Sequence, residues 1–513
     1  MKALPLIALL IGSIAVLPAQ SWSDWEISDQ PIQNGVNCES HLLSDGSLLV
    51  LHEDEVDLGV EVQRLLTLQT FKDGTFTSQP IMYVGTTDVT TDAHQIRLIG
   101  NGRVCWAIWR TENSAGENSL KALQVAPFTG SITPETVSSE SSWWEFDACL
   151  GHDDLPRVAF ISHDLKTGWL SRRTPMGGWE SAARFLTPPS TILHDIAIAS
   201  RDMQLDVFLC VGTNLSGAGL GSGFSSGLYR YYGPETENWS ALAFPNTQTW
   251  DTASFPTSND PVAFDLRAQW TPDGRIAATY ANFSDRTAYL ATWKDGVLER
   301  DNYFTGAATR VRETNLACAS DGRILVTYRD ATAPAIRIWK AGTFGAPIMV
   351  SEMDGLREFD IELQANDFPW ISGCEPQTFP APNLRVGTPI ENTDLDHDGF
   401  IRFLEEAFHM NPSAPDADQG PIFSVAKVGG EDYLTLSYLS DSGGSGGNPY
   451  LTADYVYQVE VSTDGITWST DPSRVILADR FTITGRGTVS TVRSTQPIGS
   501  LAHEFMRVRV SYP

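Results

Sequence analysis

Five residues between positions 394 and 405 have the types and spacing of a calcium-binding loop. Asp394, Asp396 and Asp398 stand at loop positions 1, 3 and 5, Gly399 stands at position 6, and Glu405 stands at position 12. Calcium prefers oxygen ligands, and three short aspartates converge on one ion only where the chain turns sharply, which a glycine permits. Glu405 would supply both of its carboxylate oxygens. The spacing therefore predicts an EF-hand loop, with Ca²⁺ as the bound ion.

The residues around this loop complete only half of an EF-hand. Phe400 would offer its backbone carbonyl, and Arg402 stands at the position that contacts calcium through a bound water. A helix is expected after the loop, because apolar residues recur at helical spacing over 403–408 and Pro412 ends the pattern. The segment before the loop contains a proline and other helix breakers. The first helix of an EF-hand is therefore missing.

The stretch from about residue 392 to 418 resembles the single-loop units of dockerin modules and of thrombospondin type 3 repeats. A dockerin has two such units and this sequence has one, so the resemblance implies calcium binding rather than the cohesin partner of a dockerin. We expect the ion to stiffen a hinge between domains. The alternative is a calcium-dependent switch.

The N-terminus has the pattern of a secretory signal peptide. Lys2 gives the positive start, residues 4–16 form an apolar segment, and Leu17-Pro-Ala19 is a cleavage site of small residues. The apolar segment is too short to span a membrane comfortably, and no later segment qualifies. The sequence therefore predicts a signal peptide over 1–19 and a secreted protein that is extracellular or on the cell surface, with the periplasm as an alternative.

The net charge narrows the class of binding partner, whereas the cysteine content bears on disulfide formation. The net charge is −28, from 35 basic and 63 acidic side chains, so the surface should repel nucleic acid and anionic lipid. Six cysteines are an even number in an exported chain, and none of them forms a CxxC pair. They fall in expected strands, where both disulfides and buried free thiols remain open. The oligomeric state is not indicated.

One hairpin pattern recurs along the chain. Asp273-Gly-Arg-Ile-Ala-Ala-Thr-Tyr280 matches Asp321-Gly-Arg-Ile-Leu-Val-Thr-Tyr328, and each is an expected turn followed by an expected strand. A further strand precedes each turn, and another follows. Four short strands per repeat of roughly 45 residues are typical of a β-propeller. Weaker copies of the pattern begin at Asp45, Asn101, Asp153, Asp202 and Asn366.

Seven copies predict an all-β chain with a seven-bladed β-propeller over residues 30–390. This part resembles the sialidase-like, or BNR-like, group of secreted bacterial propellers, which also includes polyuronide lyases, although the Ser-x-Asp-x-Gly-x-x-Trp box of sialidases is absent from the repeats. Apolar and polar residues alternate in three segments near the C-terminus, which predicts a small β-sandwich over 421–513. The calcium segment over 392–418 would connect these domains.

Candidate binding residues occupy one position of the repeat. Strand side chains alternate, so the residues eight positions before each turn should face the same way at the mouth of the central channel. Most of these residues are acidic or polar, and His94 stands beside one of them, so they would form a ring at the mouth. The seven residues are Asn37, Ala93, Glu145, His194, Asp265, Glu313 and Glu358.

Three interpretations of this ring remain open. Two carboxyl groups could act as acid and base in glycoside hydrolysis. His94 or His194 could instead act as the base of a polysaccharide lyase, with Arg97 or Arg267 neutralising the substrate carboxylate. The ring could instead bind a ligand without catalysis. As the alternative to all three, its polar residues could be merely hydrated or could cap neighbouring backbone groups.

Two tryptophans next to the ring favour a sugar ligand. Trp143 and Trp144 directly precede Glu145, and an exposed indole can stack on the face of a sugar ring. We therefore expect binding of an extracellular glycan or protein partner at the channel. A carbohydrate-active enzyme, either hydrolase or lyase, is the first alternative, and a structural cell-surface protein is the second.

Overall fold

A computed structural model describes most of the chain as two compact units. Unit 1 comprises Met1–Glu26, Ala365–Phe368 and Thr388–Pro513, and unit 2 comprises Ile27–Gln364 and Pro369–Gly387. The expected signal peptide and three calcium ligands, Asp394, Asp396 and Asp398, lie outside the described residues. The described residues are 22, 25–32, 35–57, 62–72, 74–86, 96–112, 118–126, 133–138, 143–162, 167–185, 191–213, 227–235, 246–251, 263–282, 287–295, 297–305, 314–330, 333–364, 367–375, 383–390, 400–414, 416, 419–463, 468–498, 500 and 504–511.

The described residues of unit 2 form seven small sheets, numbered here from the first to the seventh. In the first six sheets the first strand in sequence is the inner strand, and hydrogen-bonded neighbours follow one another along the chain; in the seventh sheet the inner strand is β27 (Arg357–Leu363). The first four sheets contain β2 (Gly35–Leu42), β3 (Leu48–Asp57), β4 (Val62–Lys72) and β5 (Thr75–Thr86); β6 (Ile96–Gly100), β7 (Cys105–Glu112), β8 (Asn118–Ala126) and β9 (Glu135–Ser138); β10 (Trp143–Leu150), β11 (Pro156–Ser162), β12 (Gly168–Arg172) and β13 (Ala183–Phe185); and β14 (Thr191–Arg201), β15 (Gln204–Thr213), β16 (Gly227–Pro234) and β17 (Asn246–Asp251).

The remaining three sheets follow the same plan with two variations. In the sixth sheet a short additional strand pairs with β24, and in the seventh sheet the outermost strand is β1, from the start of the chain. These sheets contain β18 (Ala263–Trp270), β19 (Ile276–Asn282), β20 (Thr287–Lys294) and β21 (Val297–Thr305); β22 (Asn315–Cys318), β23 (Ile324–Asp330), β24 (Ala333–Lys340), β25 (Thr343–Phe344) and β26 (Ile348–Met349); and β27 (Arg357–Leu363), β28 (Pro369–Cys374), β29 (Asn383–Pro389) and β1 (Trp25–Pro31). The turn η2 (Ser351–Met353) precedes β27.

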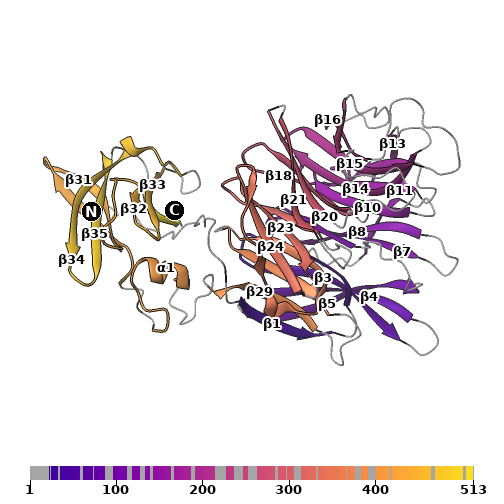
Figure 1. Ribbon diagram of the computed structural model, residues 1–513, viewed down its shortest axis with the longest axis horizontal. Helices are drawn as coiled ribbons and strands as arrows, with labels where there is room; N and C mark the ends of the chain where they lie inside the picture. Colours follow the sequence, from indigo (N-terminus) through magenta and orange to yellow (C-terminus); the bar gives the residue numbers. More distant parts are fainter. Residues whose placement is uncertain are drawn as a thin grey trace. The chain divides into compact units, whose positions relative to one another are not determined.

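The seven inner strands form a closed ring. β2 contacts β6, β6 contacts β10, and the series continues through β14, β18 and β22 to β27, which contacts β2 again. β1 pairs with β29 in the last sheet of the ring, and Figure 1 shows these two strands side by side. The sheets are thus arranged as in a propeller, which the repeats in the sequence predicted.

The repeated turns lie between the first and second strand of each sheet, as the sequence predicted. The Asp45 carboxylate accepts a hydrogen bond from the Ser47 N–H (3.0 Å), and the Asp321 carboxylate accepts one from the Arg323 N–H (3.1 Å). Gly46 and Gly322 follow these aspartates with φ of 81° and 86°, a conformation that glycine adopts without strain. The turn chemistry therefore fixes where each inner strand ends.

Strands within the ring are buried on both faces, because each sheet packs against two neighbours. In β15, Val207 and Leu209 pack toward the third sheet, whereas Phe208 and Cys210 pack toward the fifth. This explains why the sequence of β15 is a nearly continuous apolar run rather than an alternating one. The six cysteines are all free, and all lie in strands.

Unit 1 contains two sheets that share one core with a short helix. Strands predicted near the C-terminus appear as β31, β33 and β36, and α1 follows residue 401 as expected. The core combines apolar residues of both sheets with Phe403, Leu404 and Ala407 of α1. The elements are α1 (Arg402–Ala407), η5 (Pro472–Arg474), one sheet of β30 (Ile422–Val428), β31 (Glu431–Ser440), β35 (Gly487–Pro497) and β34 (Val475–Ile483), and one of β32 (Tyr450–Leu451), β33 (Val456–Ser462) and β36 (Phe505–Ser511).

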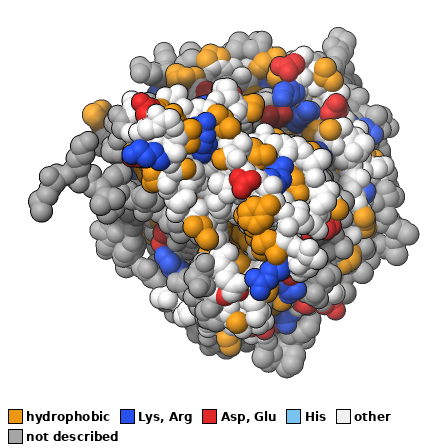
Figure 2. Space-filling model, turned by 90° about the vertical axis from the view of Figure 1, so that its left-hand side faces the viewer, with side chains coloured by type: hydrophobic (Ala, Val, Ile, Leu, Met, Phe, Trp, Pro, Cys, Tyr) orange, Lys and Arg blue, Asp and Glu red, His pale blue; other side chains and the backbone are white. Residues whose placement is uncertain are grey.

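The surface carries scattered apolar side chains. Ile422 and Val425 on β30 and Phe481 on β34 are half exposed or more. On the face drawn in Figure 2, hydrophobic side chains lie in small groups that are separated by charged and other polar surface. Among the described residues, no helix has the length and hydropathy needed to cross a membrane.

Candidate functional site

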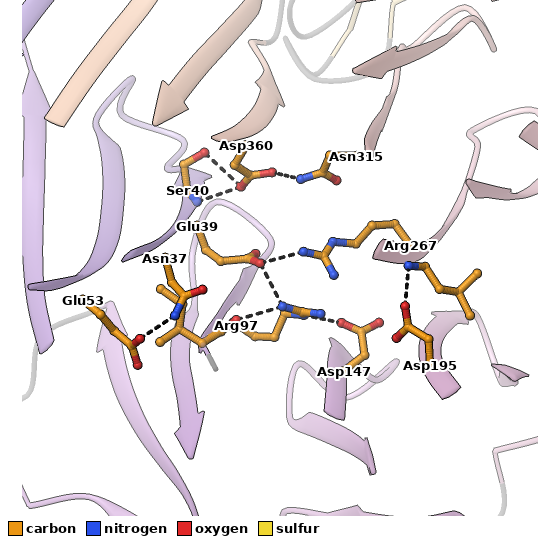
Figure 3. Close-up of polar contacts among 12 residues, drawn as sticks. Asn37, Glu39, Ser40, Glu53, Arg97, Asp147, Asp195, Arg267, Asn315 and Asp360 are labelled. Atoms are coloured by element: carbon orange, nitrogen blue, oxygen red, sulfur yellow. Dashed lines mark hydrogen bonds and ion pairs between the residues drawn. The ribbon is translucent and has the colours of Figure 1, made fainter. Parts of the chain in front are cut away.

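The inner strands place a cluster of charged and polar side chains at the centre of the ring. We call it the central polar cluster, and Figure 3 shows how its members point toward one another. Each of the seven inner strands contributes at least one member, so residues far apart in sequence meet here. The members are Glu39, Arg97, Asp147, Asp195, Arg267, Asn315 and Asp360.

Two arginines hold the cluster together through shared carboxylates. Arg97 Nε donates to Asp147 Oδ1 (2.6 Å), and Arg97 Nη1 donates to Glu39 Oε1 (3.0 Å). Arg267 Nη2 donates to the same Glu39 oxygen (3.0 Å). Arg97 is 3% exposed, so these ion pairs are shielded from water. The arginines thereby connect the inner strands of the first, second, third and fifth sheets.

Carboxyl groups of the cluster also bridge neighbouring inner strands. Asp360 accepts hydrogen bonds from the Ser40 N–H (2.7 Å) and the Ser40 hydroxyl (3.1 Å), which connects the seventh sheet to the first. Asp147 accepts from the Ile198 N–H (2.9 Å), and Asp195 accepts from the Leu266 N–H (2.8 Å). These contacts satisfy buried backbone donors that have no strand partner at the ring centre.

A cavity of about 380 Å³ lies between this cluster and the repeated turns. Its wall includes His41, whose Nδ1 is 3.5 Å from a Glu362 carboxylate oxygen, and Trp270 at the end of β18. Asn37, Glu145, His194 and Asp265, which were predicted to line the channel mouth, lie near the other end of their inner strands. Most of the segments that lead into the inner strands there are outside the described residues.

Glu145 is the predicted residue with the most unusual environment. It lies in an irregular stretch of β10 between Trp143 and Phe146, and it is 6% exposed. Its Oε2 atom is buried without a hydrogen-bond partner in the described structure. Burial, together with the charge of Asp195, raises the pKa of Glu145 well above its ordinary value, although Arg97 opposes the shift. A carboxyl group in this environment favours its neutral, proton-bearing form.

Burial also raises the pKa of Asp195 to about 7 and that of Asp360 to about 8. The rise for Asp195 starts from an ordinary value of 3.8, so the folded protein keeps a proton that the unfolded chain releases. Asp195 therefore stabilises the fold below about pH 4, and this contribution is lost as the pH rises toward 7.

We expect a measurable effect of Asp195 on pH dependence. Between pH 5 and pH 7 the wild type should lose about 1 kcal/mol of unfolding free energy per pH unit relative to the Asp195→Asn variant. Urea denaturation of both proteins at several pH values measures this difference. Parallel stability profiles of the two proteins would contradict the proposed protonation of Asp195.

The other predicted ring residues have mixed outcomes. Asn37 donates its side-chain amide to Glu53 within the first sheet, so it does not join the central polar cluster. His194 is half-buried, and burial lowers its pKa. Asp265 is buried at a φ of 58°, and its backbone carbonyl accepts a hydrogen bond from the Thr314 hydroxyl (2.7 Å). The residues Ala93, His94 and Glu313, and the side chains of Trp143, Trp144 and Glu358, lie outside the described part.

Sequence reasoning missed most members of the central polar cluster. Glu39, Asp147, Asn315 and Asp360 stand two residues after the predicted position, and alternate residues of a strand share a face. The signal was therefore present, because a polar residue recurs at this second position in six of the seven repeats. Arg97 and Arg267, considered for a lyase, are instead engaged with Glu39.

A second group of titratable residues lies on the repeated-turn side. His152, Asp153 and Glu235 each place a potential metal ligand within 4.8 Å of the others. However, Arg157 donates hydrogen bonds to the carboxylates of Glu235 and Asp153, and the bond to Asp153 is 2.9 Å long. The positive guanidinium of Arg157 would repel a metal ion. His152 Nδ1 is 3.1 Å from Glu235. We interpret this group as an ion-pair cluster that connects the third and fourth sheets.

Neither a scan against protein-family models nor a search of curated proteins finds a match to this chain. Solved structures with a similar arrangement include an α-L-arabinanase from Penicillium chrysogenum complexed with arabinobiose, with 12% identity, a TM-score of 0.39, and coverage of 70% of this chain and 97% of that one. The polysaccharide lyase Uly1 has 9% identity, a TM-score of 0.42, and coverage of 76% and 94%. A lectin from Aleuria aurantia has 10% identity, a TM-score of 0.37, and coverage of 62% and 97%.

Proposed function

We propose that the protein binds a neutral extracellular glycan at the channel mouth where β10 begins. The observation that carries this proposal is the buried Glu145 Oε2 atom, which has no hydrogen-bond partner in the described structure. An unsatisfied buried carboxyl oxygen is costly, and a ligand hydroxyl would remove that cost. Trp143 and Trp144 directly precede Glu145 in sequence and offer indole rings for sugar stacking.

The charges of the site favour a neutral rather than an acidic glycan. Arg97 and Arg267 are engaged with carboxylates of the cluster, so they are not placed to neutralise a uronate. The net charge of −28 also repels polyanions. A protonated Glu145 can both donate to and accept from sugar hydroxyls, as neutral sugars require.

Replacing Glu145 with glutamine tests this proposal. The change keeps the shape of the side chain but replaces one oxygen with an NH2 group that cannot accept a hydrogen bond, so a sugar hydroxyl that donates there is left unpaired and we expect binding to weaken about tenfold or more. Affinity electrophoresis in gels that contain arabinan, xylan or β-glucan measures the binding. Glu352→Gln, at an exposed glutamate of η2, is the matched control. Equal retardation of Glu145→Gln and wild type would refute the proposal, as would no retardation of wild type in any gel.

Glycoside hydrolysis is a second candidate, because the negative charge of Asp195 contributes to the raised pKa of Glu145. Two carboxyl groups with different proton affinities are what acid and base catalysis requires. The protonated Glu145 would donate its proton to the glycosidic oxygen, and a second carboxylate would activate the attacking water. Release of reducing ends from the bound polysaccharide, absent in Glu145→Gln, would support hydrolysis. Ultraviolet-absorbing unsaturated products would indicate a lyase instead.

We also propose that residues 394–405 bind calcium. Their donor set consists of carboxylate and carbonyl oxygens, which calcium prefers. The described ligands are compatible with this role: Glu405 is fully buried in the first turn of α1, and Phe400 is also buried. The charge of Arg402 is offset, because its Nε donates to Glu406 at 2.7 Å. The bound ion would fix the loop against α1, and α1 is itself packed in the unit 1 core.

We further propose that the chain is exported, that unit 2 is a seven-bladed propeller and that the two sheets of unit 1 form a sandwich. Export is supported by the N-terminal sequence pattern. It is also supported by the weak calcium affinity expected of this loop, because such a site is occupied only where calcium is abundant. The propeller is supported by the closed contacts among the seven inner strands, and the sandwich by the single core that the two sheets share.

A further inference from the structure

A second cavity, of about 610 Å³, opens between the fourth and fifth sheets on the repeated-turn side of unit 2. Trp270 and Tyr232 line it, together with Met203 in the turn before β15 and Gln204, the first residue of β15. Trp270 also lines the central cavity, so the groove lies next to the opening of the channel at this end. It is separate from Glu145, which lies near the start of its inner strand.

The two aromatic rings of the groove are held in fixed positions by one buried aspartate. Trp270 Nε1 donates to Asp206 Oδ2 (3.1 Å), and Arg230 Nε donates to Asp206 Oδ1 (2.6 Å). The Arg230 guanidinium lies over the ring of Tyr232, 4.3 Å from its centroid. Asp206 and Arg230 are fully buried. Because the rings are already ordered, a ligand that stacks on them loses little free energy in immobilising side chains.

Arg201 also helps to order Trp270. The Arg201 guanidinium lies 5.7 Å from the Trp270 ring centroid, and its Nη1 donates to the Thr271 carbonyl (2.8 Å). Its positive charge is 3.6 Å from the Asp202 carboxylate. Arg201 therefore helps to order the groove. Because Asp202 partly neutralises the charge of Arg201, this arginine attracts an anionic ligand only weakly.

Polar groups stand at the rim of the groove. The side chain of Asp202 is 88% exposed, and its backbone has a φ of 55°, which orients it at the tip of the turn between β14 and β15. Gln204 is half-buried, and it donates its side-chain amide to Asp206 (3.1 Å), which leaves its carbonyl oxygen as an acceptor. Met203 is 55% exposed between them. Ordered aromatic rings can pack against the C–H face of a ligand, and the neighbouring acceptors can receive hydrogen bonds from its hydroxyl groups. The groove therefore fits a ligand that has both features.

We propose that this groove is a second saccharide-binding subsite, which takes a neutral sugar ring against Trp270 and Tyr232. The sugar C–H face would pack on the aromatic rings, and its hydroxyls would donate to Asp202 and Gln204. The volume lies in the range of small-molecule pockets. An anionic sugar is disfavoured by Asp202. This subsite does not depend on Glu145, so the two binding sites can succeed or fail independently.

Met203→Arg tests the subsite in the full-length protein. Met203 is exposed at the rim, so a longer charged side chain should obstruct the groove without disturbing the core. The probes are arabinohexaose, xylohexaose and cellohexaose, each titrated by isothermal calorimetry. We expect the affinity of the groove for at least one hexasaccharide to fall about tenfold or more in Met203→Arg and to be retained in Glu145→Gln. Met176→Arg is the matched control, because Met176 is 98% exposed on the third sheet away from the groove.

Two further variants separate the chemistry from simple obstruction. Asp202→Ala should weaken the same binding by removing a hydroxyl acceptor, and Tyr232→Leu should weaken it by removing an aromatic face. Unchanged affinity of Met203→Arg for every hexasaccharide that wild type binds would overturn the proposal. Binding of a proline-rich peptide at the groove, with no saccharide bound there, would also overturn it.

Discussion

Replacing Arg97 with methionine should lower the unfolding free energy of unit 2 by about 3–5 kcal/mol, because it leaves buried carboxylates without their counter-charge. Arg97 is 3% exposed and pairs with both Glu39 and Asp147. Methionine keeps much of the volume of the arginine stem, so the main loss is the guanidinium. Urea denaturation followed by tryptophan fluorescence measures the change.

Two comparisons make this prediction specific to the ion pairs. Arg103→Met removes an exposed arginine from the turn of the same sheet and should change stability by less than about 0.5 kcal/mol. Adding Glu39→Gln to Arg97→Met should cost less than the sum of the single changes, because the second change removes a buried carboxylate that has already lost one of its two arginine partners. Full additivity, or equal stability of Arg97→Met and Arg103→Met, would show that the pairs do not stabilise the ring.

Calcium should raise the unfolding free energy of unit 1 by about 2 kcal/mol when its concentration is roughly fifty times the dissociation constant. Extracellular loops of this type bind with constants of about 10⁻⁴–10⁻³ M, so millimolar calcium is required. The effect should vanish in the Asp396→Ala variant, which removes a predicted ligand at loop position 3. Thermal unfolding with calcium and with a chelator measures it.

Calorimetry gives an independent measure that does not depend on unfolding. Titration of calcium into wild type should release binding heat, and titration into Asp396→Ala should not. Asp454→Asn, at an exposed turn of unit 1, is the control for a general loss of negative charge. An undiminished heat in Asp396→Ala would contradict the ligand assignment, whatever the effect on stability.

The sequence allowed the sheets and their turns to be predicted because these depend on local chemistry. An aspartate followed by a glycine determines the turn, and the apolar run after it determines the strand. The copies at Asp273 and Asp321 can therefore be recognised in the sequence. The three C-terminal strands were also predicted, from alternation along β31, β33 and β36. Each of these features is determined within about ten neighbouring residues.

The central polar cluster could not be predicted to the same degree, because its contacts join distant strands. Nothing near Glu39 in sequence indicates that Arg97 and Arg267 will both bind it, at separations of 58 and 228 residues. The irregular pairing of β10 between Trp143 and Phe146 also shifts side chains relative to the turn that follows. Counting back from the turn therefore does not reveal that Asn37 bonds to Glu53 in its own sheet, and the role of Glu145 stays a prediction.

The pairing of β1 with β29 has a consequence for folding. β1 is synthesised first, whereas its partner β29 ends at Pro389. The edge of β1 therefore remains unpaired while more than three hundred further residues are synthesised. Contacts of such long range slow folding, and an unpaired strand edge invites aggregation during the wait. Pairing of β1 with β29 is therefore a late step, and a peptide with the sequence of residues 25–31 should compete with β1 for the free edge of β29.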